Sequence, residues 1–203
     1  ASLDGSRFID EAIRRGAIAV VCDSRVKRIS RKGMPLVKVN DTRLAAASLA
    51  AEFYNNPSRR VKIIGITGTC GKTTVAYMLE AIIHKAGFKP AVIGTVNYRF
   101  NKIVVPSKNT TPGPVELQSL MSNMAKEHID YSATEVSSHA LDQGRVLGID
   151  FHSAVFTNLT QDHLDYHKNL RSYFHAKSKL FKGLSAKAFA VLNQDDKHYP
   201  LLK

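Results

Sequence analysis

From residue 61 onward, short apolar segments alternate along the chain with longer segments in which apolar residues recur at helical spacing. The apolar segments predict strands at 61–67, 91–96, 131–136, 151–158 and 188–193. Strands separated by helices are typical of a parallel sheet in which each helix crosses over to the next strand. The pattern therefore predicts an α/β fold, a mostly parallel sheet flanked by helices and preceded by a smaller α/β unit.

Two of the predicted helices have a well-defined apolar face. The first begins at Thr73 and ends at Gly87, and its face consists of Met78, Leu79, Ile82, Ile83 and Ala86. The second begins at Pro114, and its face consists of Leu117, Leu120, Met121 and Met124. Between the two helices, 97–105 is predicted to form a hairpin that turns at Asn101 and Lys102.

Residues 1–56 form a separate and smaller pattern. A helix that ends at Gly16 precedes two strands, at 17–23 and 35–40, and a second helix follows with Asp41, or Asn40 before it, as N-cap. The segment "NNPSRR" then interrupts the pattern with a turn-forming Asn-Pro pair. We therefore predict two domains, 1–56 and 57–203.

Charge narrows the choice of partners. Lysine and arginine outnumber aspartate and glutamate by 29 to 17, which gives a net charge of +12 in 203 residues. This balance favours anionic partners, either nucleic acid or phosphate-bearing small molecules. The densest basic stretch, 24–33, stands beside no recognition-helix, aromatic-platform or zinc-knuckle pattern, so we interpret it as a solvated loop and expect no nucleic acid as a partner.

The sequence also bears on the compartment. Cys22 and Cys70 are the only cysteines, too few for a disulfide framework. No apolar run approaches the roughly 20 residues needed to span a bilayer, and the first residues have no signal-peptide pattern. We therefore expect a cytoplasmic protein without a membrane span.

The segment "GITGTCGKTT", 65–74, joins a predicted strand to a predicted helix through a glycine-rich turn. Backbone N–H groups in such a turn, together with the helix N-terminus, form an anion site. Lys72 would neutralise phosphate oxygens, and the hydroxyl of Thr73 would reach Mg²⁺. Because Ile66 stands where the standard pattern has its first glycine, the loop is a shortened variant. The alternative is a tight turn without a ligand, but the strand and helix on either side favour nucleotide binding.

Two further segments follow predicted strands, where open α/β sheets bind ligands. Glu135 offers hard oxygen ligands for Mg²⁺, although a strand-end carboxylate taken alone is more often simply exposed. His163 and His167 are four residues apart, a spacing that also occurs in zinc sites, but no further ligand completes a tetrahedral set. We predict that Asp162 caps a helix, that His163 faces the site and that His167 is structural.

The segment 169–181 predicts a helix with a lysine in its apolar face. The apolar stripe consists of Tyr173, Phe174, Leu180 and Phe181. Lys177 lies three or four residues from each of them, whereas Lys179 points elsewhere and is predicted to be solvated. A lysine in such a stripe usually extends its amine to water. The alternative is a desolvated amine with a lowered pKa that can attack carbon dioxide, and the spacing leaves both open.

Five segments, in order and at matching spacing, resemble the Mur ligase family, and within it the branch that extends a UDP-muramoyl dipeptide. They are "GTCGKTT", "NTTP", "EVSSHALDQGRV", "FTNLTQDHLDYH" and "YFHAKSKLF". The third segment discriminates best between the branches of the family. Cys70 stands where the family usually has asparagine, while the glycines, the lysine and the threonines of the loop match.

The resemblance implies an ATP-dependent amide ligase of peptidoglycan synthesis. In that reaction, ATP phosphorylates the terminal carboxylate of UDP-MurNAc-L-Ala-D-Glu, and the amine of a diamino acid attacks the acyl phosphate. We expect meso-diaminopimelate rather than lysine, because it is the commoner choice in the family. The alternatives are another Mur or folylpolyglutamate-synthetase-type ligase and a nucleotide-binding module without turnover.

The resemblance also assigns residues by position. The nucleotide-binding residues are Gly68, Thr69, Cys70, Gly71, Lys72, Thr73 and Thr74. The substrate-binding residues are Asn109, Thr110, Thr111, Ser137, Gln143 and Arg145. The Mg²⁺-binding residues are Thr73, Glu135, His163 and Lys177, the last as the family's carbamylated lysine. The catalytic residues in this assignment are Lys72, His163 and Lys177.

The family has three domains, and the resemblance covers part of that set. It implies that 1–56 is part of the N-terminal UDP-substrate-binding domain and that 57–203 is the central ATP-binding domain, with the C-terminal domain absent. We therefore expect these residues to form a monomer that binds nucleotide weakly and does not complete ligation alone.

Overall fold

The computed structural model of the chain describes residues 5–26 and 33–203. The basic stretch predicted at 24–33 therefore lies largely outside the described residues. The chain divides into two compact units, Ala1–Ala46 and Ala47–Lys203. This division falls inside a helix, whereas the sequence places the domain boundary between Asn56 and Pro57, which stays a prediction.

The first unit contains the small α/β pattern expected from the sequence. Its elements are η1 (Gly5–Phe8), α1 (Ile9–Arg14), β1 (Val20–Asp23) and β2 (Leu36–Val39), and the two strands pair in parallel. Helix α2 (Thr42–Phe53) begins at the predicted cap. Asp41 Oδ1 accepts hydrogen bonds from the N–H groups of Arg43 at 2.9 Å and Leu44 at 3.0 Å, which satisfies two of the donors that a helix start leaves unpaired.

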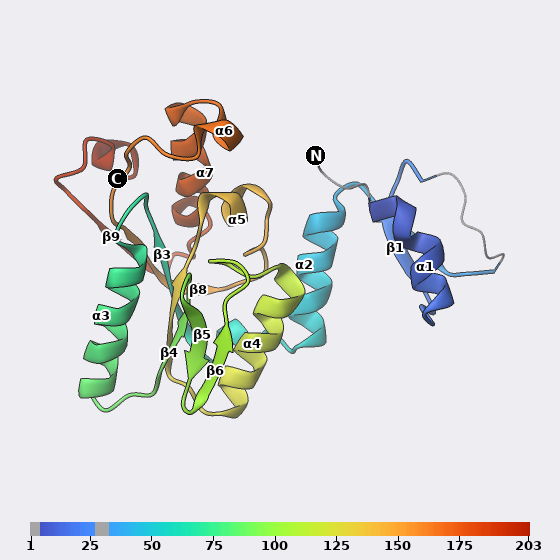
Figure 1. The fold of residues 1–203 in the computed structure, drawn as a ribbon, viewed down its shortest axis with the longest axis horizontal. Helices are drawn as coiled ribbons and strands as arrows, with labels where there is room; N and C mark the ends of the chain where they lie inside the picture. Colours follow the sequence, from blue (N-terminus) through green and yellow to red (C-terminus); the bar gives the residue numbers. More distant parts are fainter. Residues whose placement is uncertain (1–4, 27–32) are drawn as a thin grey trace. The chain divides into compact units, whose positions relative to one another are not determined.

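The second unit contains a seven-stranded sheet in the order β6-β5-β4-β7-β3-β8-β9 (Figure 1). Its strands are β3 (Lys62–Thr67), β4 (Pro90–Ile93), β5 (Asn97–Phe100), β6 (Ile103–Pro106), β7 (Tyr131–Glu135), β8 (Phe151–Phe156) and β9 (Phe189–Leu192). The five strands from β4 to β9 in this order are parallel, and β5 and β6 form the predicted antiparallel hairpin. Asn101 has φ 49° at the hairpin turn, a left-handed conformation that asparagine tolerates well.

The strands are connected by helices and short turns. These are η2 (Pro57–Arg59), α3 (Lys72–Lys85), α4 (Pro114–Lys126), α5 (Ser138–Asp142), α6 (Leu164–His167), α7 (Leu170–Lys182) and η3 (Tyr199–Leu201). Across residues 5–26 and 33–203, none of the helices combines the length and the apolar character needed to cross a membrane.

Alternate side chains of each strand point to opposite faces of the sheet, so neighbouring residues join different cores. On one face, Ile64 packs with Ala76 and Ile83 of α3. On the other face, Ile63 packs with residues of α4 and with Leu180 of α7. Figure 1 shows α3 and α4 on opposite sides of the sheet. The core therefore consists of two apolar layers that hold the sheet between them.

The structure confirms one of the two predicted helix faces and corrects the other. The face predicted for α4 is confirmed, since all its members are buried: Leu117, Leu120, Met121 and Met124. The face predicted for α3 is wrong at Met78 and Ile82, which are 59% and 64% exposed, and at Ala86, which is exposed at the C-cap. Helix α3 begins at Lys72 rather than Thr73, and its buried residues are Ala76 and Ile83. The stripe that contacts the sheet is therefore rotated from the predicted one.

Candidate functional site

The predicted ligand-binding residues gather where β4, β7, β3 and β8 end. The loops after these four neighbouring strands begin at Gly94, Val136, Gly68 and Thr157. We call this side of the sheet the carboxyl edge and the opposite side, where the parallel strands begin, the amino edge. Open α/β sheets bind ligands at the carboxyl edge because the loops of adjacent strands converge there.

The loop after β3 turns through two glycines with positive φ. Gly68 has φ +150° and Gly71 has φ +84°, conformations that other residues rarely adopt. A Cβ at Gly68 would lie 1.9 Å from Thr157 Oγ1, so the neighbouring loop also requires glycine at this position. Helix α3 follows with Gly71 as its N-cap, which directs its first N–H groups toward the loop. This strand–loop–helix geometry forms an anion site.

The loop after β8 holds the glycine-rich loop in place. Asn158 accepts a hydrogen bond from the Cys70 N–H at 3.0 Å and donates to the Cys70 carbonyl at 3.2 Å. Thr157 Oγ1 donates to the same carbonyl at 2.6 Å, and the Thr69 N–H donates to the Asn158 carbonyl at 2.9 Å. The sequence analysis did not identify Thr157 or Asn158 as site residues, although they are the last two residues of the strand predicted at 151–158.

Lys72 lies against the glycine-rich loop. Its Nζ donates to the carbonyls of Gly68 at 2.9 Å and Thr69 at 2.8 Å. Burial lowers the pKa of Lys72, and the negative charge of Glu135 opposes that shift. The amine is therefore in a place where it can neutralise an anion bound by the loop.

Lys177 is buried, with 1% of its surface exposed, which favours the desolvated amine over the alternative in which the side chain extends to water. Its Nζ donates to the Gly68 carbonyl at 2.7 Å, the same carbonyl that Lys72 contacts. The Nζ also lies 4.4 Å from the ring centre of Tyr173, whose hydroxyl bonds to Thr69 Oγ1 at 3.3 Å. Burial, and secondly the charge of Lys72, lower the pKa of Lys177 to about 7. A large fraction of this amine is therefore neutral, and hence nucleophilic, at neutral pH.

Glu135 is fully buried at the end of β7 and accepts three hydrogen bonds. The hydroxyl of Thr73 donates to Oε2 at 3.0 Å. The N–H of Thr95 donates to Oε1 at 3.1 Å, and the Thr95 hydroxyl donates to Oε2 at 3.0 Å. Thr95 is a further site residue that the sequence analysis did not identify. The structure thus brings the predicted metal-binding oxygens of Thr73 and Glu135 together beside the glycine-rich loop.

These oxygens fit Mg²⁺, which prefers hard oxygen ligands and keeps several waters. The Glu135 carboxylate and the Thr73 hydroxyl are two such oxygen ligands. A phosphate bound at the neighbouring anion site would supply further oxygens. Within the described ranges, no group of three or more His, Cys, Asp or Glu side chains could hold a metal by itself.

The predicted substrate-binding residues form a second cluster beside the first. Thr111 Oγ1 donates to the Glu135 carbonyl at 2.9 Å and accepts from the Ser137 N–H at 3.0 Å. Arg145 donates to the Thr111 carbonyl at 3.0 Å and, through two nitrogens, to Gln143 Oε1 at 3.0 and 2.7 Å. The cluster is therefore joined to the strand that carries the buried carboxylate.

Two more of the predicted substrate-binding residues lie on the segment that leads to α4. Thr110 Oγ1 is 3.0 Å from Thr95 Oγ1. The Asn109 carbonyl accepts from the Tyr98 hydroxyl at 2.5 Å, so the backbone of Asn109 is fixed by the β5–β6 hairpin. The six predicted substrate-binding residues thus belong to two neighbouring segments at the carboxyl edge.

The histidine segment differs from the prediction. Asp162 is not the helix cap; His163 is the N-cap of α6, with φ 52° and no side-chain capping bond, and Asp162 Oδ1 accepts from the His163 N–H at 2.8 Å. The His163 ring is half-exposed and packs edge-on against His139, 4.9 Å between ring centres. His167 is buried and bonds to Ser138 Oγ at 2.9 Å, as expected for a structural histidine.

Lys179, predicted to be solvated, has a partner. Its Nζ lies 2.9 Å from Asp142 Oδ1, and this contact is the main cause of the lowered pKa of Asp142. Lys177 and Lys179 therefore leave the same helix in different directions, one into the protein and one to an ion pair at its surface.

Comparison with known proteins gives consistent matches. The family model described as the Mur ligase middle domain matches residues 66–203. The chain is 45% identical over 199 residues to the UDP-N-acetylmuramoyl-L-alanyl-D-glutamate–2,6-diaminopimelate ligase of Caldanaerobacter subterraneus subsp. tengcongensis, covering 98% of this chain and 40% of that relative. A solved structure of a ligase with the same name superposes with a TM-score of 0.81 at 30% identity, over 97% of this chain and 39% of the other. A MurF ligase from Thermotoga maritima, solved in complex with ADP, shares the fold at 21% identity, with a TM-score of 0.58 over 94% of this chain and 40% of the other.

Proposed function

The chain belongs to the Mur ligase family, and we propose that it supplies the nucleotide-binding part of a ligase that joins 2,6-diaminopimelate to UDP-MurNAc-L-Ala-D-Glu. ATP transfers its γ-phosphoryl group to the terminal carboxylate of the dipeptide. The amine of diaminopimelate then attacks the acyl phosphate and releases inorganic phosphate. The names of the most similar relatives support this choice of substrates.

The chain spans about 40% of the length of the curated relatives it matches. The complete reaction is therefore a proposal for the full-length protein. We also propose the domain limits 1–56 and 57–203, a cytoplasmic location and a monomeric state. Both cysteines are free, which agrees with a reducing compartment.

The glycine-rich loop binds the nucleotide in this proposal. Residues 68–74 surround the phosphates with backbone N–H groups, and Lys72 offsets their negative charge. Phosphorylation of a carboxylate brings two anions together, so positive charge at this place lowers the barrier. The loop after β8 contributes indirectly, because Asn158 fixes the loop before the ligand binds.

Mg²⁺, when bound, would supply further positive charge that stabilises the transferred phosphoryl group. Thr73 and Glu135, whose side chains are hydrogen-bonded to each other, would hold it. We assign His163 as a third protein residue on the metal side. Lys177 adds an anionic ligand after reaction with carbon dioxide. Its neutral amine forms a bond to the carbon, a π pair moves onto oxygen, and the nitrogen releases one proton, so an uncharged amine is converted into an anion. The lowered pKa of Lys177 favours this reaction at neutral pH.

The UDP-muramoyl dipeptide binds along the second cluster in this proposal. Arg145 provides a fixed positive charge, and Gln143 holds two of its nitrogens in place. Thr110, Thr111 and Ser137 provide short polar side chains between Arg145 and the nucleotide side. Asn109 completes the set at the start of this segment.

The observation that carries the proposal is the position of Lys177, a buried lysine whose amine contacts the phosphate loop. The test is phosphate release by the full-length protein with ATP, UDP-MurNAc-L-Ala-D-Glu and diaminopimelate. We expect release to require all three substrates and to be lost in Lys72→Ala. Lysine in place of diaminopimelate, or folate substrates in place of the dipeptide, should support little release.

Two further results decide the proposal. Mass spectrometry in the presence of bicarbonate should find one carbamate, and tandem spectra should locate it at Lys177. Lys187→Ala, which removes an exposed lysine at the amino edge, should leave phosphate release unchanged. Equal release with folate substrates, or full activity of Lys72→Ala, would contradict the proposal.

A further inference from the structure

Thr95 lies between the two clusters of the site. It follows the end of β4 by two residues, and its Oγ1 is 3.0 Å from Glu135 Oε2 and 3.0 Å from Thr110 Oγ1. Its N–H donates to the other oxygen of Glu135 at 3.1 Å. One residue therefore contacts both the carboxylate on the nucleotide side and a threonine on the dipeptide side.

The direction of these hydrogen bonds follows from chemistry. An ionised carboxylate only accepts, so the single hydroxyl proton of Thr95 goes to Glu135. The contact between the two threonines must then use the proton of Thr110, with Thr95 as acceptor. The result is a directed chain from Thr110 through Thr95 to Glu135. Because Thr110 donates its only hydroxyl proton to Thr95, its hydroxyl oxygen can only accept a hydrogen bond from a ligand.

The backbone before Thr95 is shaped for this contact. A Cβ at Gly94 would lie 2.1 Å from Glu135 Oε1, so any larger residue would displace the carboxylate or the strand end. Glu135 itself is fully buried, and its three donors come from α3 and from Thr95. Two of the three bonds that orient this carboxylate therefore come from one residue.

We propose that Thr95 is a positioning residue that couples the dipeptide side of the site to the nucleotide side. A ligand that donates a hydrogen bond to Thr110 polarises the chain and strengthens the bond from Thr95 to Glu135. The orientation of Glu135, and through it the affinity for Mg²⁺–nucleotide, then depends on whether the dipeptide is bound. This inference rests on the proposed function, because it assumes that Thr110 faces the UDP-muramoyl dipeptide.

The test compares Thr95→Val, which loses the hydroxyl but keeps the shape and the backbone N–H, with Thr95→Ser, which keeps the hydroxyl. The affinity of the full-length protein for Mg²⁺–ADP is measured by calorimetry with and without UDP-MurNAc-L-Ala-D-Glu, and the ratio of the two affinities is the coupling. A hydrogen bond to a charged group corresponds to roughly a tenfold effect on a binding constant. We expect a wild-type ratio above one, a ratio near one in Thr95→Val and a retained ratio in Thr95→Ser. Thr42→Val in helix α2 is the matched control and should behave as wild type.

Outcomes that overturn the inference are distinct from those that overturn the function. A wild-type ratio of one, or an unchanged ratio in Thr95→Val at a similar melting temperature, would overturn the coupling. If the wild-type protein does not bind the dipeptide at all, the proposed function fails. The positioning of Glu135 is then decided by Mg²⁺ titration of ADP binding, in which Thr95→Val should need about tenfold more Mg²⁺ than wild type or Thr95→Ser. Equal Mg²⁺ requirements would overturn the positioning role as well.

Discussion

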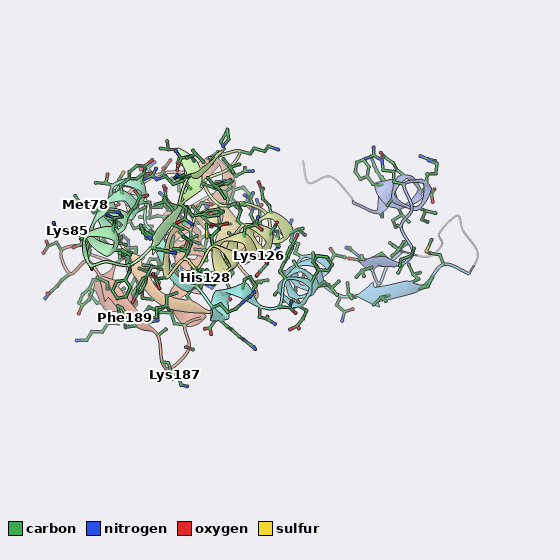
Figure 2. The ribbon with its side chains drawn as sticks, turned by 90° about the horizontal axis from the view of Figure 1, so that it is seen from below. Met78, Lys85, Lys126, His128, Lys187 and Phe189 are labelled. Carbon is green, nitrogen blue, oxygen red and sulfur yellow. The ribbon has the colours of Figure 1, made fainter. Side chains whose placement is uncertain are left out.

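The carboxyl and amino edges of the sheet use the same residue types in different ways. At the carboxyl edge, Lys177 and Glu135 are buried and each contacts named partners. At the amino edge, the lysines are exposed: Lys62, Lys85, Lys126 and Lys187. Figure 2, seen from below, labels three of them. Both edges are basic, but only the carboxyl edge combines charge with burial.

The difference shows why net charge does not locate the site. Exposed lysines are solvated and screened by salt, so each contributes little to binding or stability. A buried lysine changes its pKa, and a buried carboxylate needs several donors. Substitutions that are mild at the amino edge should therefore be severe at the carboxyl edge.

The largest contrast is expected between Lys177→Met and Lys187→Met. Loss of Lys177 removes the proposed carbamate and should lower the rate of phosphate release by the full-length protein on the order of 10²–10³-fold. Lys187→Met should stay within about twofold of wild type, because the side chain is exposed and far from the loop. Steady-state phosphate release measures both. Similar rates in the two variants would contradict the view that a buried lysine at the carboxyl edge matters more for activity than an exposed lysine at the amino edge.

The next contrast concerns two glycines. Gly68→Ala places a Cβ against Thr157 and should lower the free energy of unfolding by about 3 kcal/mol. Gly87→Ala has open space around it and carries only the cost of a positive φ, about 1 kcal/mol. Urea unfolding monitored by circular dichroism measures both. Equal losses would mean that the Gly68 loop adjusts more freely than its contacts imply.

The pH dependence of stability gives a third contrast. Because the pKa of Lys177 is about 7 in the folded protein and near 10.5 when unfolded, the unfolded chain binds an extra proton between these values. The free energy of unfolding should therefore rise with pH, by roughly 2 kcal/mol from pH 7 to 9, and Lys177→Met should remove this rise. Lys187→Met should keep it. Urea unfolding in bicarbonate-free buffer excludes the carbamate, and an identical pH profile in both variants would contradict the lowered pKa.

The smallest contrast tests the contact between loops. Asn158→Ala removes two hydrogen bonds to Cys70 and should lower the free energy of unfolding by about 1–2 kcal/mol. It should also weaken Mg²⁺–ADP binding several-fold, because the loop is no longer held before the ligand arrives. Asp130→Ala at the amino edge removes one exposed bond to the Lys89 N–H and should affect stability only slightly. Calorimetry with ADP distinguishes Asn158→Ala from Asp130→Ala. An unchanged ADP affinity in Asn158→Ala would show that the phosphate loop does not need the hydrogen bonds from Asn158.

The sequence predicted the sheet, the hairpin and the strand–loop–helix motif because these depend on local patterns. The face of α3 was misplaced because its apolar residues fit more than one helical stripe, and the sheet selected the stripe with Ala76 and Ile83. The spacing placed Lys177 in an apolar stripe but left its burial open, and its contact with Gly68 required the fold to join residues 109 positions apart.

Thr95, Thr157 and Asn158 were not identified as site residues, although Thr157 and Asn158 lie within the segment "FTNLTQDHLDYH". Their roles depend on contacts with residues 40 or more positions away, and threonine or asparagine after a strand is common in any loop. The available signal was topological: all three follow strands that end at the carboxyl edge. The order of strands in the sheet, which the sequence did not reveal, decides which of these loops meet.

The two cysteines differ in accessibility, since Cys70 is exposed on the phosphate loop and Cys22 is buried in β1. Within residues 1–203, a maleimide dye should consequently attach at a single known place without any engineered thiol. Its fluorescence would report loop occupancy in real time, and ADP should slow the labelling itself. The cysteine that weakens the family resemblance thus makes this loop directly observable in solution.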